Sequence, residues 1–268
     1  MDNKDLKLDL ENIFISDSHI ESSMDAKYMI LVELLSSFIN SPGIKNIFLL
    51  GDIFDFCTGS SRYFRKKYFV LGSLLERLVK QGTKVYFIEG NHEFYMADLK
   101  WKGVICSRAE PYLEVDIDGS KVLLTHGDML TPSRYYRFYN YFVRTRIVKW
   151  IVTYGIRMPL AEYLSVGYSR MSRGRHIGNE IKLEVLDKKV QKYMSDKSAD
   201  LLVFGHFHRY LTEFDKTIVS DKLNLTYGYI GLPWWDRPRF VNLNLRNKKI
   251  QSFVFDNNHW IIDSEKNI

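Results

Sequence analysis

The sequence predicts an α/β chain in which several strands end at one polar edge of a sheet. Short apolar runs alternate with helical patterns over the first 91 residues, and this alternation favours adjacent parallel strands. Five apolar runs end in Asp, Asn or His. Later runs have the length and composition of further strands, in part antiparallel.

The individual elements follow from these patterns. The five runs are NIFISD (12–17), KNIFLLGD (45–52), KVYFIEGN (84–91), KVLLTHGD (121–128) and LLVFGH (201–206). Helices are predicted over 26–39, before Ser-Pro-Gly, and over 63–79, before Gln-Gly. A hairpin is predicted across Asp118-Gly119, a strong turn signal, and later strands over 223–231, 239–245 and 249–255.

A helical insert is predicted between His126 and His206. Thr131 is expected as the N-cap and Pro132 as the first residue of a helix that reaches Gly155, followed by a short helix over 159–168. One face is apolar, formed by Tyr136, Tyr139, Val143, Ile147 and Trp150, and the remaining arc carries Arg134, Arg137, Arg144, Arg146 and Lys149. Either this face packs on the parent domain and the basic arc is solvated, or the insert receives an amphipathic substrate with its phosphates near the arginines.

Composition limits the classes of protein. The chain has 268 residues, 46% of them apolar, which suits one domain spanning 1–268. The net charge of +6 points to an anionic partner, whether nucleic acid, a membrane surface or a phosphorylated metabolite. Cys57 and Cys106 form no CxxC pair, which favours free thiols in a reducing compartment. No signal peptide and no membrane span are predicted.

The strand ends predict a metal site. Ligands in open α/β sheets bind where the carboxyl ends of strands emerge, so these polar residues are expected to converge. They are Asp17, His19, Asp52, Asn91, His126, His206 and His208. Seven donors exceed the needs of one ion and suit two ions about 3.5–4 Å apart, with Asp52 as the bridge. Oxygen and imidazole donors without thiolate favour Mn, Fe, Co, Ni or Zn.

The motifs differ in how specific they are. Asp-x-His (17–19) and Gly-Asp (51–52) are common turn chemistry when taken alone. GNHE (90–93) and GHFH (205–208) are stronger signals, because paired polar residues beside glycine at a strand end are uncommon in ordinary turns. It is improbable that five unrelated turns would carry these motifs in this order along one chain.

As a set, these motifs resemble the calcineurin-like metallophosphoesterase superfamily over residues 12–208. The order is DxH (17–19), GDxxD (51–55), GNHE (90–93), HGD (126–128) and GHxH (205–208). The resemblance implies a four-layer fold with two mixed sheets face to face and helices outside. It implies that Asp17, His19, Asp52 and His208 bind one divalent ion, and Asp52, Asn91, His126 and His206 the other. Mn²⁺ is the expected metal, with Fe, Co, Zn or Mg as alternatives. His92 is implied to protonate the leaving oxygen and Asp55 to orient His92.

The insert over 129–182 resembles that of UDP-2,3-diacylglucosamine diphosphatases, which release UMP and a lipid monophosphate in lipid A biosynthesis. His92 stands where the best-known of those enzymes carry Arg, so a more distant branch is expected. The resemblance implies a helical lid and a lipid-linked nucleotide diphosphate substrate. It also implies attachment to the anionic cytoplasmic face of the inner membrane, with no nucleic acid and no obligatory protein partner. The expected substrate contacts are Arg134, Tyr136, Tyr139, Arg170 and Arg173.

Alternatives remain within and outside this group. A phosphodiesterase or nuclease of the same superfamily also suits the basic charge, and a non-catalytic scaffold is the competing class. A protein phosphatase is disfavoured because Phe56 and Cys57 follow Asp55, where an arginine is expected.

Overall fold

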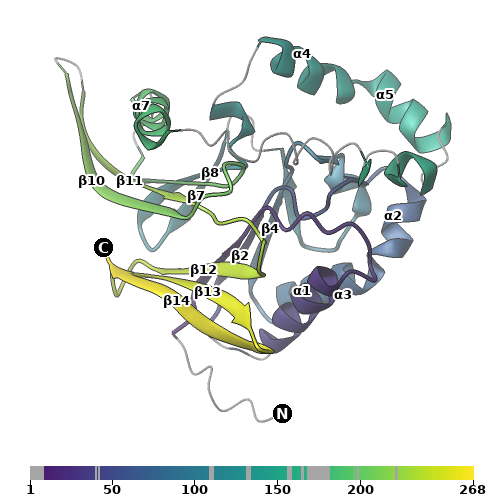
Figure 1. Cartoon of the computed structure of the whole chain (residues 1–268), viewed down its shortest axis with the longest axis horizontal. Helices are drawn as coiled ribbons and strands as arrows, with labels where there is room; N and C mark the ends of the chain where they lie inside the picture. Colours follow the sequence, from purple (N-terminus) through teal and green to yellow (C-terminus); the bar gives the residue numbers. More distant parts are fainter. Residues whose placement is uncertain are drawn as a thin grey trace.

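Two β-sheets pack face to face, and helices cover the outer face of each, which confirms the four-layer arrangement (Figure 1). The structure is a computed structural model. It describes residues 9–39, 41, 43–108, 112–130, 134–155, 159–163, 166–167, 182–195, 197, 199–220 and 223–268.

The larger sheet has seven strands in the order β14-β13-β12-β1-β2-β4-β6. Its strands are β1 (Asn12–Ile15), β2 (Asn46–Leu50), β4 (Lys84–Ile88), β6 (Ile105–Ser107), β12 (Arg239–Asn244), β13 (Lys249–Asp256) and β14 (His259–Asn267). β1, β2, β4 and β6 run parallel, whereas β12, β13 and β14 add antiparallel strands on the other side of β1. The predicted parallel strands are therefore neighbours, and their carboxyl ends share one edge.

Three helices accompany the parallel strands. They are α1 (Ala26–Ser37), α2 (Arg62–Lys67) and α3 (Phe69–Lys80). The Asp25 side chain caps α1 by accepting from the Lys27 N–H at 2.9 Å. The continuous helix predicted over 63–79 is wrong, because the chain breaks at Tyr68. The Tyr68 ring is buried and stacks on Phe54 with ring centroids 4.0 Å apart, and this packing fixes the break.

The smaller sheet has five strands in the order β10-β11-β9-β8-β7. They are β7 (Leu113–Ile117), β8 (Ser120–Thr125), β9 (Leu201–Phe204), β10 (Leu211–Ser220) and β11 (Leu223–Gly231), and α7 (Leu183–Met194) packs against this sheet. β8 and β9 run parallel. The predicted hairpin is confirmed: Asp118 and Gly119 join β7 to β8 with φ of 51° and 86°, as a type I′ turn requires.

Three apolar clusters hold the four layers together. Leu31 and Leu75 belong to the cluster between the larger sheet and its helices. Phe14 and Phe48, whose rings stack with centroids 4.7 Å apart, belong to the cluster between the sheets. Leu186 on α7 packs into the third cluster, against the smaller sheet. Because the sheets are buried on both faces, their strands read as nearly continuous apolar runs.

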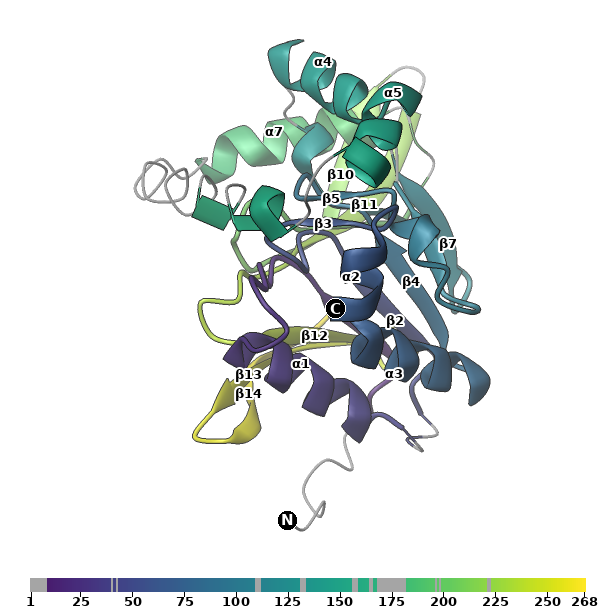
Figure 2. The ribbon, with the colours of Figure 1, turned by 90° about the vertical axis from the view of Figure 1, so that its right-hand side faces the viewer.

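The insert breaks where one helix was predicted. It contains α4 (Arg134–Val143), α5 (Arg146–Trp150) and a π-helical turn η3 (Ile151–Gly155), and 159–163 is helical again (Figure 2). The Thr145 side chain accepts from the Val148 N–H at 3.4 Å and so caps a new helix, which leaves Arg144 outside both. The predicted cap at Thr131 and Pro132 lies outside the described residues.

Short elements complete the chain. β3 (Cys57–Thr58) pairs with β5 (Glu93–Phe94), and the 3₁₀ turns are η1 (Met96–Leu99) and η2 (Asp128–Leu130). Among the described residues, no helix has both the length and the apolar character needed to cross a bilayer.

Candidate metal centre

The carboxyl ends of the strands bring all seven predicted ligands to one region. The loops after β1, β2 and β4 in the larger sheet carry Asp17 and His19, Asp52, and Asn91. The loops after β8 and β9 in the smaller sheet carry His126, His206 and His208. The site is therefore built from both sheets. Among the hydrogen bonds that join the two sheets there, the His206 N–H donates to the Asp17 carboxylate at 3.0 Å.

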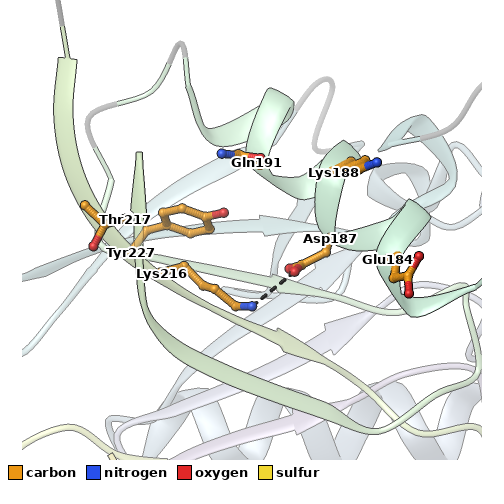
Figure 3. Close-up of a pocket in the computed structure, with 7 residues that line it drawn as sticks. All are labelled: Glu184, Asp187, Lys188, Gln191, Lys216, Thr217 and Tyr227. Atoms are coloured by element: carbon orange, nitrogen blue, oxygen red, sulfur yellow. Dashed lines mark hydrogen bonds and ion pairs between the residues drawn. The ribbon is translucent and has the colours of Figure 1, made fainter. Parts of the chain in front are cut away.

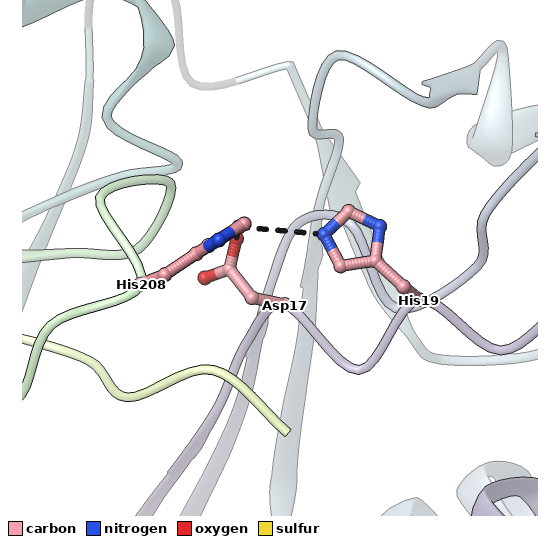
Figure 4. A group of neighbouring side chains, drawn as sticks. All are labelled: Asp17, His19 and His208. Carbon is pink, nitrogen blue, oxygen red and sulfur yellow. Dashed lines mark hydrogen bonds and ion pairs between the residues drawn. The ribbon is translucent and has the colours of Figure 1, made fainter. Parts of the chain in front are cut away.

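Asp17, His19 and His208 form one group of donor atoms, all within 4.8 Å of one another (Figure 4). Nε2 of His208 lies 3.4 Å from Oδ1 of Asp17 and 3.5 Å from Nε2 of His19. Asp17 is fully buried, and its carboxylate also accepts from the Ser16 hydroxyl. One carboxylate and two imidazoles that face a common point form a donor set suited to a divalent transition metal.

Asp52, His126 and His206 form a second group within the same limit. Nε2 of His126 lies 3.3 Å from Oδ2 of Asp52 and 3.2 Å from Oδ1 of Asn91. Nδ1 of His126 lies 3.0 Å from the Leu50 carbonyl, so it needs its proton to donate there. In a neutral ring, Nε2 then carries a lone pair, and this lone pair faces two further acceptors, Oδ2 of Asp52 and Oδ1 of Asn91. A cation on Nε2 resolves this convergence of acceptors, either as a second ring proton, which the Asp52 carboxylate favours, or as a metal ion, which the set of carboxylate, amide and imidazole donors fits.

The titrating groups of the site shift one another. Burial raises the pKa of Asp52, but the charges of His126 and His92 outweigh it, and the pKa lies well below its usual value. Burial lowers the pKa of His126, but the Asp52 carboxylate outweighs it, and the pKa is raised well above the ordinary value. Burial and the nearby charge of His126 lower the pKa of His206 to about 4. His206 therefore offers a neutral imidazole, the form that binds metals.

Five candidate ligands have left-handed backbone conformations. Their φ values are 53° for Asp17, 47° for His19, 51° for Asp52, 68° for His206 and 55° for His208. Non-glycine residues adopt this conformation at a cost of about 1–2 kcal/mol each, and such strain concentrates at functional sites.

Two glycines leave room for the carboxylates. A Cβ atom on Gly90 would overlap Oδ1 of Asp52, and one on Gly205 would lie 2.5 Å from Oδ2 of Asp17 and overlap the Ser16 hydroxyl. The glycine that begins GNHE and the glycine that begins GHFH are thus explained by close approach. The Asp52 and Asp17 carboxylates occupy the space that a side chain at 90 or 205 would need.

His92 and Asp55 lie beside the metal-binding groups, but not in the predicted arrangement. Asp55 was expected to orient His92 through its carboxylate. Instead, Nδ1 of His92 bonds the Asp55 main-chain carbonyl at 2.8 Å. Oδ1 of Asp55 lies 3.2 Å from Nδ1 of His19. The left-handed backbone at His19 places its ring beside Asp55, so the Asp55 carboxylate faces His19 and only its main-chain carbonyl faces His92. Nε2 of His92 lies 3.8 Å from Oδ2 of Asp52.

Glu93 is a buried residue of the site that sequence reasoning missed. Its carboxylate accepts from the main-chain N–H groups of Asp52, Phe54 and Gly90 at 3.1, 2.9 and 3.2 Å. Burial, and then the charge of Asp52, raise the pKa of Glu93 to about 8. The sequence signal for Glu93 was its place at the end of GNHE, next to a predicted buried site. A carboxylate that is buried needs several hydrogen-bond donors. Glu93 ties the GDxxD and GNHE loops together.

The insert meets the centre through only part of its predicted contacts. The Tyr136 hydroxyl donates to Asp128, which follows His126 in HGD, at 2.6 Å. Arg134 is exposed. Tyr139, Ile147 and Trp150 are 43%, 73% and 64% exposed, so this side of the apolar face does not pack on the parent domain. Arg170 and Arg173 lie outside the described residues.

A surface pocket lies away from the centre, between α7 and the β10–β11 hairpin (Figure 3). Within it, Asp187 accepts from Lys216 at 3.1 Å and from the Tyr229 hydroxyl at 2.8 Å. Its lining residues are Glu184, Asp187, Lys188, Gln191, Lys216, Thr217 and Tyr227, and none of them is a predicted site residue.

The chain is similar in sequence to a known family and to proteins of known name. A family model for calcineurin-like phosphoesterases matches residues 13–210. The chain is 27% identical over 206 residues to a UDP-2,3-diacylglucosamine hydrolase of Aeromonas salmonicida, covering 75% of this chain and 78% of the relative. It is 24% identical over 255 residues to the protein of that name from Vibrio parahaemolyticus, covering 92% and 100%. A zinc-complexed Vps29 structure from Entamoeba histolytica is 11% identical, covers 96% of this chain and 98% of that chain, and has a TM-score of 0.45. The ordered motifs, the four layers and the match over residues 13–210 agree: the chain belongs to the calcineurin-like phosphoesterase family and is a metal-dependent hydrolase.

Proposed function

We propose that this chain hydrolyses the pyrophosphate of UDP-2,3-diacylglucosamine to UMP and 2,3-diacylglucosamine 1-phosphate, a step of lipid A biosynthesis. The observation that carries the proposal is the insert. Exposed aromatic side chains lie on α4, and the same helix contacts the candidate metal centre through the Tyr136–Asp128 hydrogen bond. An amphipathic substrate needs both an apolar surface and a phosphate-binding centre. The names of the relatives at 24–27% identity support the same substrate.

The ligands proposed for one ion are Asp17, His19, Asp52 and His208, and those for the other are Asp52, Asn91, His126 and His206. Support comes from the group Asp17, His19 and His208 and from the group Asp52, His126 and His206. A third group, His19, Asp55 and His92, shares His19 with the first, and Oδ2 of Asp52 faces both His126 at 3.3 Å and Nε2 of His92 at 3.8 Å. Two divalent ions, Mn²⁺ first among them, supply Lewis acidity and hydroxide near neutral pH. Asp55 then orients His19 as its carboxylate partner.

His92 is proposed as the general acid. Because Nδ1 donates to the Asp55 carbonyl, the Nε2 edge is the one left for the substrate. In hydrolysis an oxygen of water forms a bond to one phosphorus, and the bridging P–O bond breaks. The protonated Nε2 gives its proton to the departing phosphate oxygen. The carbonyl holds the ring in one orientation in both protonation states.

The insert over 129–182 is proposed to act as a lid that holds the acyl chains. Phe138 and Tyr141 are 67% and 75% exposed, and their rings offer apolar area to lipid. Tyr136, Tyr139, Arg170 and Arg173 are the further proposed substrate contacts. Arg134 and Arg137 lie on the same helix and attract anionic headgroups, as does the net charge of +6. The chain is accordingly proposed to work on the cytoplasmic face of the inner membrane.

The test compares two substrates across matched variants. UMP release from UDP-2,3-diacylglucosamine in mixed micelles is measured beside hydrolysis of soluble bis-p-nitrophenyl phosphate, with Mn²⁺, Co²⁺, Zn²⁺ or Mg²⁺ and with chelator. Phe138→Asp is expected to lower the lipid reaction at least about tenfold and to spare the diester, since a charge on the lipid-binding face opposes insertion. Phe69→Asp on α3 is the control, because that ring is equally exposed, at 68%, but lies outside the insert.

The outcomes separate the parts of the proposal. Diester cleavage without UMP release refutes the substrate and leaves a phosphodiesterase or nuclease. Equal loss on both substrates for Phe138→Asp refutes the role of the insert. Activity that resists the chelator refutes the metal centre.

A further inference from the structure

Arg144 reaches from the insert into the protein and lies against the GNHE loop. It follows α4 directly, at the break before Thr145. Its side chain is only 6% exposed, although helical spacing predicted a solvated arginine. NH1 donates to Oδ1 of Asn140 at 2.6 Å, and the guanidinium lies over the Phe94 ring with its carbon 5.1 Å from the centroid.

The other end of the guanidinium brackets two residues of the site. NH2 lies 3.4 Å from the Gly90 carbonyl and 3.5 Å from the Glu93 carbonyl. The residues between these carbonyls are Asn91, a candidate ligand, and His92, the candidate acid. NH2 also lies 3.3 Å from Oε2 of Glu89, whose carboxylate is 4% exposed. The three distances are long for hydrogen bonds, but all three oxygens direct negative charge at one buried cation.

A second contact holds the same junction. The Tyr95 hydroxyl lies 2.7 Å from the Val143 carbonyl and 3.1 Å from the Thr145 carbonyl. Tyr95, the residue after GNHEF, therefore bonds the carbonyls of both residues that neighbour Arg144 in the chain. Arg144 in turn holds the carbonyls on either side of Asn91-His92. The loop and the insert are thus fastened to each other in both directions.

We propose that Arg144 is a positioning residue, which fixes Asn91 and His92 from the insert without touching substrate. This rests on the roles proposed above for those two residues. The Gly90 and Glu93 carbonyls and the Glu89 carboxylate all face NH2, while NH1 is held by Asn140 and the guanidinium lies over the Phe94 ring. The rigid planar group therefore fixes NH2 where the three oxygens converge, whereas a lysine ammonium has no second nitrogen for Asn140 and no flat face for the ring. The insert therefore contributes to the metal centre itself as well as to the surface that meets lipid.

The experiment measures Mn²⁺ binding as well as turnover. The variants are Arg144→Lys and the pair Arg144→Met with Glu89→Gln, which removes both buried charges together. Asn140→Ala is a milder third variant, which releases NH1 and removes a 3.8 Å contact to Sδ of Met129 outside the bracket. Arg65→Met is the matched control, because Arg65 is exposed and also donates to a main-chain carbonyl, that of Asp98 at 2.9 Å, outside the bracket. Readouts are free Mn²⁺ by electron paramagnetic resonance, kcat and KM on bis-p-nitrophenyl phosphate, and thermal unfolding.

Arg144→Lys is expected to weaken binding of one of two Mn²⁺ ions about 10–100-fold, the usual effect of removing a group that orients a ligand. It should lower kcat by about tenfold or more, with KM within about twofold, while Arg65→Met matches the wild type. Asn140→Ala should move both quantities in the same direction by a smaller factor.

Unchanged Mn²⁺ affinity and kcat in folded Arg144→Lys overturn the inference, even if the unfolding temperature falls. If both Arg144 variants fail to fold, unchanged values in Asn140→Ala overturn it. A wild type that binds two Mn²⁺ and cleaves the diester but not the lipid refutes the proposed substrate alone. A wild type that binds no Mn²⁺ refutes the ligand assignment and this inference with it.

Discussion

Gly90→Ala adds one methyl group at the point where the Asp52 carboxylate meets the GNHE loop. The new Cβ atom would overlap Oδ1 of Asp52 and lie 2.5 Å from its main-chain nitrogen and 2.9 Å from Cγ. The φ of Gly90 is outside the left-handed region, so alanine adds no backbone strain there. The perturbation is therefore confined to a displacement of Asp52 and of the loop.

The size of the effect follows from that displacement. Carbon atoms in ordinary contact are about 3.5 Å apart, so Asp52 and the loop must separate by roughly 1 Å. A shift of this size at a reacting centre typically costs about 100-fold in rate. Because Asp52 is assigned to both ions, Mn²⁺ binding should weaken as well. We expect a loss of about 100-fold in kcat on bis-p-nitrophenyl phosphate.

Two other glycines are controls. A Cβ atom on Gly72 in α3 would overlap the Trp101 ring, and one on Gly167 meets nothing within 4 Å. Gly72→Ala should lower the free energy of unfolding by about 1–3 kcal/mol through overpacking, with Mn²⁺ stoichiometry unchanged. Gly167→Ala should match the wild type. If Gly90→Ala retains both ions and cleaves the diester within about twofold of the wild-type rate, Asp52 is not required at its observed position.

Other predictions concern His92, Asp55 and the Cys106 thiol. His92→Gln should lower kcat about 10²–10⁴-fold with both ions bound, as expected for a general acid, and loss of metal would contradict its assigned role. Asp55→Asn should instead weaken Mn²⁺ affinity about 10–100-fold, because its carboxylate faces His19 while its carbonyl remains for His92. Burial, and then the carboxylates of Glu89 and Glu93, raise the pKa of Cys106 from 9.0 to about 12. The thiol therefore stays protonated at pH 8, with about 1000-fold less thiolate than at the ordinary pKa, and its alkylation by iodoacetamide should quicken about tenfold per pH unit from 8 to 10. Rapid labelling of the native protein at pH 8 would show that the thiol is not shielded in this way.

The sequence was most informative where local pattern and topology agree. Apolar runs that end in polar residues predicted the strands and the convergence of their polar ends, because parallel strands share their carboxyl ends. The single edge expected for them was wrong: Asp17 and Asp52 follow strands of the larger sheet, whereas His206 follows a strand of the smaller one. The turn at Asp118-Gly119 was predictable because two positive φ angles need this chemistry.

Side-chain partners were less predictable, because they depend on backbone rotations that no periodicity reveals. The left-handed φ of His19 decides that the Asp55 carboxylate faces this ring. Arg144 was assigned to a solvated arc on the assumption of one unbroken helix, whereas the Thr145 cap ends that register and frees the arginine to bond carbonyls. Tyr68 ends α2 for a similar reason, through the aromatic packing of its ring. In each case tertiary contacts overrode a pattern that was correct locally.

The left-handed residues at the metal centre lower the thermal stability of the protein while they provide the donor atoms that hydrolysis requires. Glycine at any one of the five positions would relieve about 1 kcal/mol or more of backbone strain while deleting the donor atom. A library of variants screened for thermal stability alone should therefore accumulate glycine or asparagine at 17, 19, 52, 206 and 208, and lose turnover as it gains melting temperature. The same drift is open to any descendant of this chain that is no longer selected for hydrolysis. In such a lineage, these five positions are where the first substitutions that abolish hydrolysis are expected.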